Sequence, residues 1–217
     1  MVTVGVVHST RLVVEPVHQA LTAQCSGIDF FHVMDEGILR ALARFGRIDD
    51  SITHWLGRMV TSAVDEGAAL VVVSCSSLSP CVNAIREQTR VPVLKIDEPM
   101  IEAAVSAHSR IGLVMTNPTT EKSSQLLIAE VSRRLGKPVT VVPRLCTEAF
   151  AKLNRGDITG HDAEVALTIQ SLLDDVDVVV LAQISIARII DQIDPQIAPR
   201  VLSSLRFIAP EINALLT

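Results

Sequence analysis

A cysteine that follows a buried strand is the residue of this chain best placed for acid–base chemistry. Cys75 comes two residues after the apolar run Leu70–Val73 and precedes a predicted helix over Pro80–Thr89. Backbone N–H groups at the start of a helix favour a thiolate, and a thiolate can remove a proton from carbon or return one to it. The alternative is a small buried thiol that only packs. We predict that Cys75 is catalytic.

An internal repeat gives Cys75 a counterpart. Three stretches of the first half align, at a spacing of about 107 residues, with three of the second: Thr3–Thr10 with Arg110–Asn117, Val71–Ser77 with Val179–Ser185, and Val93–Lys95 with Val201–Ser203. Gln183 then stands where the first half has Cys75. An amide does not exchange protons at neutral pH, so we predict that Gln183 orients a substrate or stabilises developing enolate charge.

The elements that position these residues alternate between short apolar runs and longer helical patterns, which indicates an α/β fold with parallel sheets. The expected strands are Val2–Val7, Phe30–Val33, Leu70–Val73, Val91–Ile96, Ile111–Met115, Val139–Val142, Val176–Leu181 and Val201–Leu202. The expected helices cover residues 16–23, 48–66, 80–89, 120–135, 161–173 and 186–192. We expect two similar subdomains related by a pseudo-twofold, residues 1–97 plus 208–217 and residues 98–207, with an active-site cleft between them. Pro210–Leu216 is expected to pack on the first half.

Polar residues at strand ends are the candidates for substrate binding, because ligands of parallel α/β sheets bind at the carboxyl ends of the strands. The candidates are His8, Ser9, Ser76, Ser77, Thr116, Asn117, Thr120 and Ser185. Hydroxyls and amides at such positions are also ordinary turn and cap residues, and a histidine there can be tied to the backbone.

Other reactive side chains have weaker cases. Cys25 and Cys81 lie in helical patterns and are expected to pack, whereas Cys146 follows a strand and could approach the cleft. Asp35 and Glu36 are more typical of a solvated turn than of a ligand for a substrate amine.

Composition excludes several classes of protein. Apolar residues make up 48% of the 217 residues, with no Tyr and one Trp, which suits a Val/Ile/Leu/Ala core. The net charge of −5, without a basic stripe, argues against nucleic acid as a partner. No apolar run is long enough to span a membrane and no basic leader precedes the first strand, so a cytoplasmic location is expected. Four cysteines without metal-type spacing predict reduced thiols and no metal site. No cofactor is expected, because the sequence has no glycine-rich phosphate loop and no lysine in a pyridoxal-type setting.

The chain resembles the aspartate/glutamate/hydantoin racemase superfamily over nearly its whole length. The stretches that carry the resemblance are Val71–Ser77, similar to the first cysteine loop, Arg110–Thr120, similar to a strand with paired threonines, and His32–Leu39. The family implies a cofactor-independent mechanism, in which two cysteines face each other across a carboxylate substrate and exchange its α-proton. Gln183 departs from this pattern at the second cysteine, so symmetric two-thiol racemisation is in doubt.

Three functions remain open. The first is a racemase or epimerase, an isomerase in which another group replaces the missing thiol. The second is a single-thiol isomerase or decarboxylase, a lyase whose logic resembles the arylmalonate decarboxylase branch. The third is a non-catalytic protein that binds small acids. Each implies a small carboxylate as partner, and the family suggests a homodimer.

Overall fold

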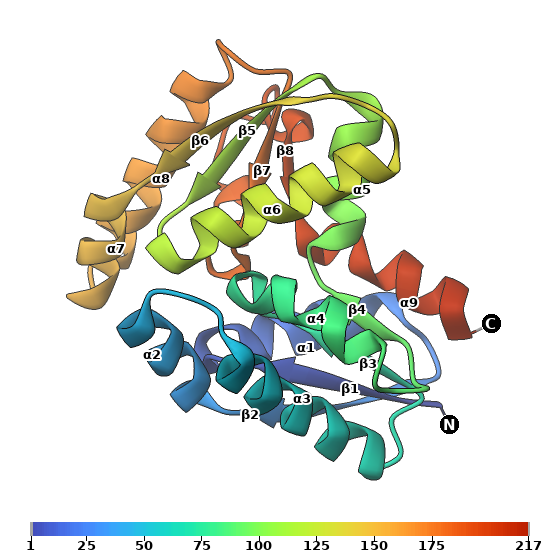
Figure 1. Cartoon of the computed structure of the whole chain (residues 1–217). Coiled ribbons are helices and arrows are strands. Elements are labelled where there is room, and N and C mark those ends of the chain that lie inside the picture. Colours follow the sequence, from blue (N-terminus) through green and yellow to red (C-terminus); the bar gives the residue numbers. More distant parts are fainter. Residues whose placement is uncertain (1, 217) are drawn as a thin grey trace. The chain divides into compact units, whose positions relative to one another are not determined.

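The computed structural model describes residues 2–216, with the side chain of Asn154 left aside. The chain divides into two compact units, one made of residues 1–99 and 207–217 and the other of residues 100–206. Each unit contains one four-stranded parallel sheet with helices packed against it (Figure 1). The expected α/β fold with two parallel-sheet subdomains is confirmed.

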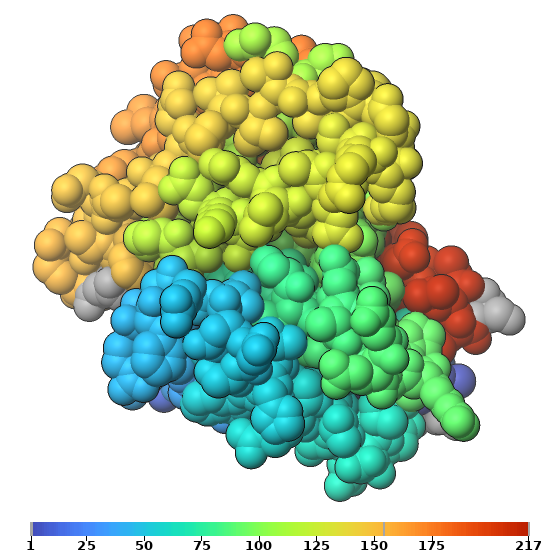
Figure 2. Space-filling model, in the orientation of Figure 1, coloured from blue at the N-terminus to red at the C-terminus, as the bar shows by residue number. Residues whose placement is uncertain are grey.

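The first unit has the strand order β2-β1-β3-β4. Its strands are β1 (Val2–His8), β2 (Ile28–Met34), β3 (Leu70–Val73) and β4 (Val93–Lys95). Its helices are α1 (Val14–Gln24), α2 (Glu36–Phe45), α3 (Asp50–Asp65), α4 (Ser79–Arg86) and α9 (Ile208–Leu216), with short 3₁₀ turns η1 (Arg11–Val13) and η2 (Ser76–Leu78). Figure 2 shows α2, α3 and α4 forming a continuous surface of this unit.

The second unit repeats this order as β6-β5-β7-β8. Its strands are β5 (Arg110–Met115), β6 (Thr140–Leu145), β7 (Val178–Leu181) and β8 (Val201–Ser203). Its helices are α5 (Glu98–Ala107), which begins in the last residues of the first unit, α6 (Pro118–Arg134), α7 (Thr147–Asn154) and α8 (Ile158–Leu172), with 3₁₀ segments η3 (Ile184–Asp191), η4 (Ala198–Arg200) and η5 (Ser204–Arg206).

Strand register makes the two sheets equivalent residue by residue. In the first sheet Gly5 pairs with Val71, which pairs with Val93. In the second sheet the corresponding triplet is Gly112, Val179 and Val201. Four residues beyond the central member of each triplet stand Cys75 and Gln183. Cys75 and Gln183 therefore occupy equivalent positions after β3 and β7, and that they face one another stays a prediction.

Apolar strand residues and the inner faces of the helices form the core of each unit. In the first unit Val71 packs in one cluster with Leu56 of α3 and Val82 of α4, all fully buried. Asp49 starts α3 by accepting hydrogen bonds from the N–H groups of Ser51 and Ile52, as its side-chain chemistry predicts. These contacts bury the body of the first sheet, and loops form its carboxyl edge.

The C-terminal segment returns to the first unit, as expected. The Sγ of Cys25 donates to the carbonyl oxygen of Ala209 at 3.8 Å, and Nδ2 of Asn213 donates to the carbonyl oxygen of Gln24 at 3.3 Å. α9 is therefore part of the same compact body as α1.

Several boundaries differ from the sequence expectation. The strand expected at Val139–Val142 runs over Thr140–Leu145, and the segment expected as a helix at residues 186–192 forms the 3₁₀ segment η3. α2, α5 and α7 are additional to the helices expected from the sequence, and each is short, with 10, 10 and 8 residues. Within residues 2–216, no helix is both long and apolar enough to cross a membrane.

Candidate active site

Cys75 lies just beyond β3, at the carboxyl edge of the first sheet. Its backbone is extended, with φ −102° and ψ 106°, and it is the residue from which η2 starts. The residue is half-buried, whereas the other cysteines are buried. The hydroxyl of Ser9 and the backbone N–H groups of Ser77 and Leu78 face its sulfur. The apolar run thus delivers one thiol into a loop rich in hydrogen-bond donors.

The protonation state of Cys75 differs from the sequence expectation. Burial raises the pKa of this thiol, hydrogen bonds from Ser9, Leu78 and Ser77 lower it, and the charge of Asp97 raises it, so that the pKa lies above its usual range. The expectation that helix N–H groups make Cys75 a thiolate is therefore wrong, because loss of water around the sulfur outweighs the donors. At neutral pH the residue is a thiol.

Two buried charged side chains lie on the strand and turn next to the cysteine loop. Lys95 and Asp97 are 1% and 2% exposed. The Ser79 hydroxyl donates to Oδ1 of Asp97 at 3.0 Å, while Oδ2 has no hydrogen-bond partner among the described residues. Burial raises the pKa of Asp97, although hydrogen bonds, including one from the Ser76 hydroxyl, and the charge of Lys95 oppose this. Ser76, predicted to bind substrate, thus contacts this carboxyl.

Three histidines form a hydrogen-bonded chain that ends beside the cysteine loop. Nδ1 of His8 lies 2.8 Å from the hydroxyl of Ser74, and Nε2 of His8 lies 2.8 Å from Nδ1 of His32. Nε2 of His32 in turn lies 3.0 Å from Nδ1 of the half-buried His18. Burial and the neighbouring His32 lower the pKa of His8 to about 4. His8 is therefore neutral at neutral pH, and both of its ring nitrogens already have partners.

The same chain has a defined set of proton positions. The Ser74 hydroxyl also donates to the carbonyl oxygen of Val7 at 3.1 Å, so in that arrangement Nδ1 of His8 must carry the proton it shares with Ser74. His8 and His32 then donate from Nδ1 and accept at Nε2, and His18 donates from Nδ1. Burial and His18 lower the pKa of His32, opposed by Glu15.

Gln183 holds the corresponding place in the second sheet by binding the end of β5. Its Oε1 accepts hydrogen bonds from the backbone N–H groups of Thr116 at 2.6 Å and Asn117 at 3.0 Å, and from the Thr116 hydroxyl at 3.3 Å. Three donors converge on one atom, so that atom is the amide oxygen and not the nitrogen. The Nε2 of Gln183 is the group left to donate to a ligand.

These bonds assign local roles to several predicted substrate ligands. The N–H groups of Thr116 and Asn117 serve Gln183, and Oδ1 of Asn117 caps α6 by accepting from the N–H of Thr119 at 3.1 Å. Thr120 is buried in the first turn of α6, and its N–H donates to the carbonyl oxygen of Asn117 at 3.1 Å. Ser185 is half-buried, and its carbonyl oxygen accepts from Nη1 of Arg188. Direct substrate contact by these residues, and by Ser9 and Ser77, stays a prediction.

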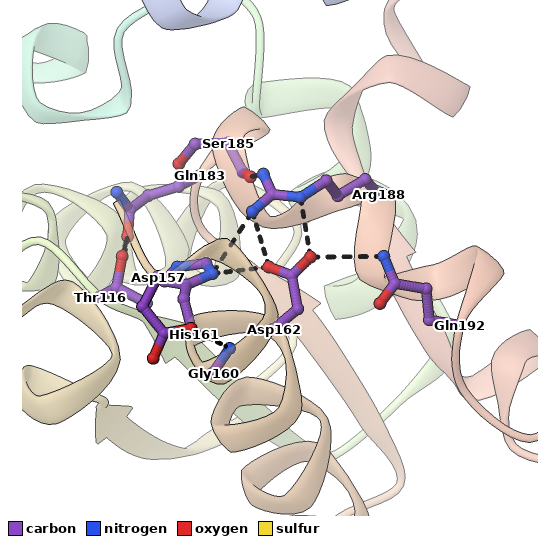
Figure 3. Close-up of polar contacts among 9 residues, drawn as sticks. All are labelled: Thr116, Asp157, Gly160, His161, Asp162, Gln183, Ser185, Arg188 and Gln192. Atoms are coloured by element: carbon purple, nitrogen blue, oxygen red, sulfur yellow. Dashed lines mark hydrogen bonds and ion pairs between the residues drawn. The ribbon is translucent and has the colours of Figure 1, made fainter. Parts of the chain in front are cut away.

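A second polar cluster of the same unit was not found from the sequence (Figure 3). Nδ1 of His161 lies 2.6 Å from Oδ1 of Asp162. Nε and Nη2 of Arg188 donate to the two oxygens of Asp162 at 2.9 and 2.6 Å, and Nε2 of Gln192 donates to Oδ2 at 3.3 Å. Burial raises the pKa of Asp162, but hydrogen bonds from Arg188 and His161 outweigh it, so the pKa lies below its usual range. Asp162 is a carboxylate with all its partners in place.

The remaining candidates have structural positions. Cys25 and Cys81 are buried, as predicted, and Cys146 is also buried, with its Sγ 3.5 Å from the Thr168 hydroxyl. Asp35 caps α2 and accepts from Nε1 of Trp55 at 2.8 Å. Over residues 2–216 no group of three or more His, Cys, Asp or Glu side chains could hold a metal ion.

The chain is similar in sequence to known proteins. The family model for Asp/Glu/Hydantoin racemase matches residues 7–212. A glutamate racemase of Exiguobacterium sibiricum is 27% identical over 178 residues, covering 78% of this chain and 65% of that protein. An uncharacterized protein of Schizosaccharomyces pombe is 27% identical over 146 residues, covering 65% and 60%. The chain thus spans about 60 to 65% of the length of these relatives.

Solved structures share the fold at low sequence identity. A glutamate racemase from Thermus thermophilus has a TM-score of 0.73 at 18% identity, covering 99% of this chain and 80% of its own. An allantoin racemase from Klebsiella pneumoniae has a TM-score of 0.71 at 15% identity, covering 100% and 88%. An aspartate racemase of Picrophilus torridus has a TM-score of 0.69 at 14% identity, covering 94% and 90%.

Proposed function

Because this chain belongs to the Asp/Glu/hydantoin racemase family, we propose that it catalyses cofactor-independent proton transfer at the carbon next to the carboxylate of a small acid. Cys75 carries the proposal. It is a half-buried thiol at the carboxyl edge of a parallel sheet, and the Ser9 hydroxyl and two backbone N–H groups face its sulfur. In this reading Cys75 is the catalytic acid or base and the enzyme is an isomerase.

The proposed role of Cys75 begins from its thiol form. The thiol gives its proton to an enediolate carbon, so that an S–H bond breaks, a C–H bond forms and a thiolate remains. Ser9 stabilises that thiolate, because its hydroxyl is one of the hydrogen-bond donors that face the sulfur. The reverse step, in which the thiolate takes an α-proton, uses the same donors.

Gln183 supports the same chemistry from the second unit in our proposal. The oxygen of its amide is fixed by Thr116 and Asn117, which leaves the Nε2–H groups as donors. A fixed donor aimed at an oxygen that gains negative charge lowers the barrier to enolate formation. That Cys75 and Gln183 share one cleft stays a prediction.

A decarboxylase is the second candidate, and the amide at position 183 together with the raised pKa of Cys75 favours it. Loss of CO₂ from a malonate-type acid leaves an enediolate that needs one proton on one face. A residue that rests as a thiol supplies that proton without prior deprotonation. The amide at position 183 is no obstacle to such a lyase, because no second thiol is required.

Deuterium wash-in tests the proposal. The protein is incubated in D₂O with each enantiomer of aspartate and glutamate and with allantoin, and α-deuterium is measured by mass spectrometry; phenylmalonate with CO₂ detection tests the lyase. We expect exchange or CO₂ release, and a loss of about 10²–10⁴-fold in Cys75→Ser, the usual contribution of a general acid or base. Cys25→Ser is the matched control, since a serine keeps the bond to the Ala209 carbonyl.

Each outcome has a meaning. Exchange without CO₂ release supports the isomerase, and CO₂ release supports the lyase. Binding of these acids by calorimetry with neither reaction indicates a non-catalytic binder and contradicts the proposal. Equal rates in Cys75→Ser and Cys25→Ser would contradict the role of the thiol.

A further inference from the structure

His161 lies at the edge of the second sheet where a ligand would be expected. α8 leads back to the start of β7, so its first turn lies near the carboxyl ends of the strands, where β5 ends at Met115 and where Gln183 follows β7. His161 belongs to this first turn, and its N–H donates to the carbonyl oxygen of Asp157 at 3.1 Å. Figure 3 shows His161 in one close-up with Thr116 and Gln183.

Asp162 fixes the tautomer of His161. Asp162 is a carboxylate that can only accept, so Nδ1 of His161 carries a proton and donates it across 2.6 Å. Nη2 of Arg188 is 3.4 Å from the same Nδ1, but both are donors, so this contact is no hydrogen bond. In the neutral form of the ring the lone pair is therefore on Nε2, in the arrangement by which carboxylates orient catalytic histidines.

The Nε2 atom is the unusual feature. It has no hydrogen-bond partner among residues 2–216, and the whole His161 side chain is 0% exposed to solvent. A buried acceptor without a donor costs free energy, and such groups call for an explanation in a function or a ligand. By contrast, Nδ1 of His161, both carboxylate oxygens of Asp162, and Nε and Nη2 of Arg188 all have partners (Figure 3).

The first unit has no such histidine at the equivalent position. Asp49 and Asp157 cap α3 and α8 in the same way, and the N–H of Thr53 donates to the carbonyl oxygen of Asp49 at 3.0 Å as that of His161 does to Asp157. Thr53 is thus the counterpart of His161. The unit that has a thiol carries a threonine there, and the unit that has an amide in place of the thiol carries a histidine.

We propose that His161, held by Asp162, is the acid–base group of the second unit and supplies the proton-transfer function that Gln183 lacks. This rests on the proposed function. In the forward step the α-C–H bond of a small acid breaks, its electron pair moves into the carboxylate as an enediolate, and an N–H bond forms at Nε2. Asp162 stabilises the resulting imidazolium. The thiol of Cys75 then protonates the carbon and becomes a thiolate, and reverse turnover or exchange with solvent restores both groups.

Two substitutions of His161 separate catalysis from structure. His161→Asn keeps a donor near the position of Nδ1 and hence the bond to Asp162, but it removes Nε2. His161→Gln places an amide near the position of Nε2 without a basic lone pair. We expect both variants to lose racemisation of aspartate or glutamate by about 10²–10⁴-fold. His54→Asn on α3, at an exposed histidine, is the matched control and should keep wild-type rates.

Wash-in of deuterium sharpens the result, because each group acts on one enantiomer. His161→Asn should lose α-exchange from the enantiomer that His161 deprotonates and keep exchange from the enantiomer that Cys75 deprotonates, while Cys75→Ser shows the opposite pattern. Wild-type exchange of both enantiomers by His161→Asn would overturn the inference. Absence of any exchange in the wild-type protein would instead overturn the proposed function.

A measurement on the wild-type protein is independent of how the variants fold. Long-range ¹H–¹⁵N NMR should find the neutral form of His161 with the proton on Nδ1 and the lone pair on Nε2. Addition of malonate, a carboxylate probe that does not racemise, should shift the Nε2 resonance. A proton on Nε2, or no shift at saturating malonate, would contradict the proposal.

Discussion

The carboxyl edges of the two sheets can be compared residue by residue, because the same backbone hydrogen bonds hold both. The N–H of Ser74 donates to the carbonyl oxygen of Val7 at 3.0 Å, and the N–H of Ala182 donates to that of Val114 at 2.9 Å. On this shared frame the side chains differ in kind. The pairs are His8 and Met115, Ser74 and Ala182, Cys75 and Gln183, and Lys95 and Ser203.

The two units differ in where they hold their ionisable side chains. The loop of the first unit holds a thiol beside buried ionisable groups, His8, Lys95 and Asp97. The loop of the second unit fills the N–H groups at the end of β5 with an amide oxygen and keeps its ionisable pair, His161 and Asp162, on α8. The two units therefore share a backbone arrangement but carry different reactive side chains.

After Cys75 and His161, substitution of Gln183 should have the largest effect on activity. Gln183→Glu can still accept from Thr116 and Asn117 but offers no Nε2 donors, and its charge opposes an enolate. We expect a loss of about 10²–10³-fold in turnover, the effect of removing one such donor. Gln183→Cys should also weaken the native reaction without adding racemisation, because the amide is bound into its loop rather than vacant. Turnover is measured for these variants and Gln183→Ala.

The control is Gln196→Glu, at an exposed glutamine after η3. Unchanged turnover in all Gln183 variants would make the amide a bystander. A rise in racemisation in Gln183→Cys would mean that the amide merely replaces a lost thiol.

Acidification should weaken the first unit through His8. The native pKa of about 4 lies below the usual 6.5, so the unfolded chain binds a proton between these values and the native chain does not. Stability from this group is present above pH 6.5 and falls as pH decreases toward 4, by at most about 3 kcal/mol. Urea unfolding of wild type and His8→Met across this range measures it.

His8→Met introduces the residue of the second unit and should give a flatter pH dependence. His54→Met at the exposed histidine of α3 should keep the wild-type slope. An equal slope in all three proteins would contradict the assignment to His8.

Alanine at Gly5 of β1 or at Gly112 of β5 should lower the free energy of unfolding, because both strands pack closely against helices. A Cβ at Gly5 would lie 2.8 Å from Cβ of Ala63, and a Cβ at Gly112 would lie 2.6 Å from Cδ2 of Leu172. Gly5→Ala and Gly112→Ala should each destabilise by about 1–3 kcal/mol. We expect Gly5→Ala to cost more, because Cβ of Ala63 cannot rotate away whereas the end of Leu172 can.

Thermal or urea unfolding measures both changes, and Ala63→Gly should partly rescue Gly5→Ala. The control is Gly57→Ala on α3, where the nearest atom is 4.0 Å from the added Cβ. This change should be neutral or slightly stabilising, since alanine favours helix more than glycine does. Equal stability of Gly5→Ala and Gly57→Ala would refute the contact.

The smallest effect concerns thiol labelling. Cys75 is half-buried and the other three cysteines are buried, so iodoacetamide should modify Cys75 first. Its raised pKa makes the rate low at neutral pH and steeply rising with pH. Mass spectrometry of digested protein follows each site. Faster modification of Cys25 in folded protein would show that access to Cys75 is closed.

The sequence predicts the frame better than the contacts. Apolar strand runs with small polar ends are local patterns, so the repeat and the match of Cys75 with Gln183 could be predicted. The bond between Gln183 and Thr116 joins residues 67 apart, and that between Arg188 and Asp162 joins residues 26 apart. Such partners depend on strand order and helix placement, which no local pattern encodes. The thiol form of Cys75 was missed for a related reason, since burial is a property of the folded loop.

The return of α9 to the first unit determines the order in which the parts of each unit leave the ribosome. Residues 100–206 form the second unit and lie in the chain between the two segments of the first. Cys25 can therefore bond to the carbonyl oxygen of Ala209 only after residues 100–206 have been synthesised. A ribosome releases the whole second unit before it releases the helix that completes the first. Domains generally fold as units while the chain emerges. We therefore expect the unit with Cys75 to be completed last, after the unit with His161 has been able to fold.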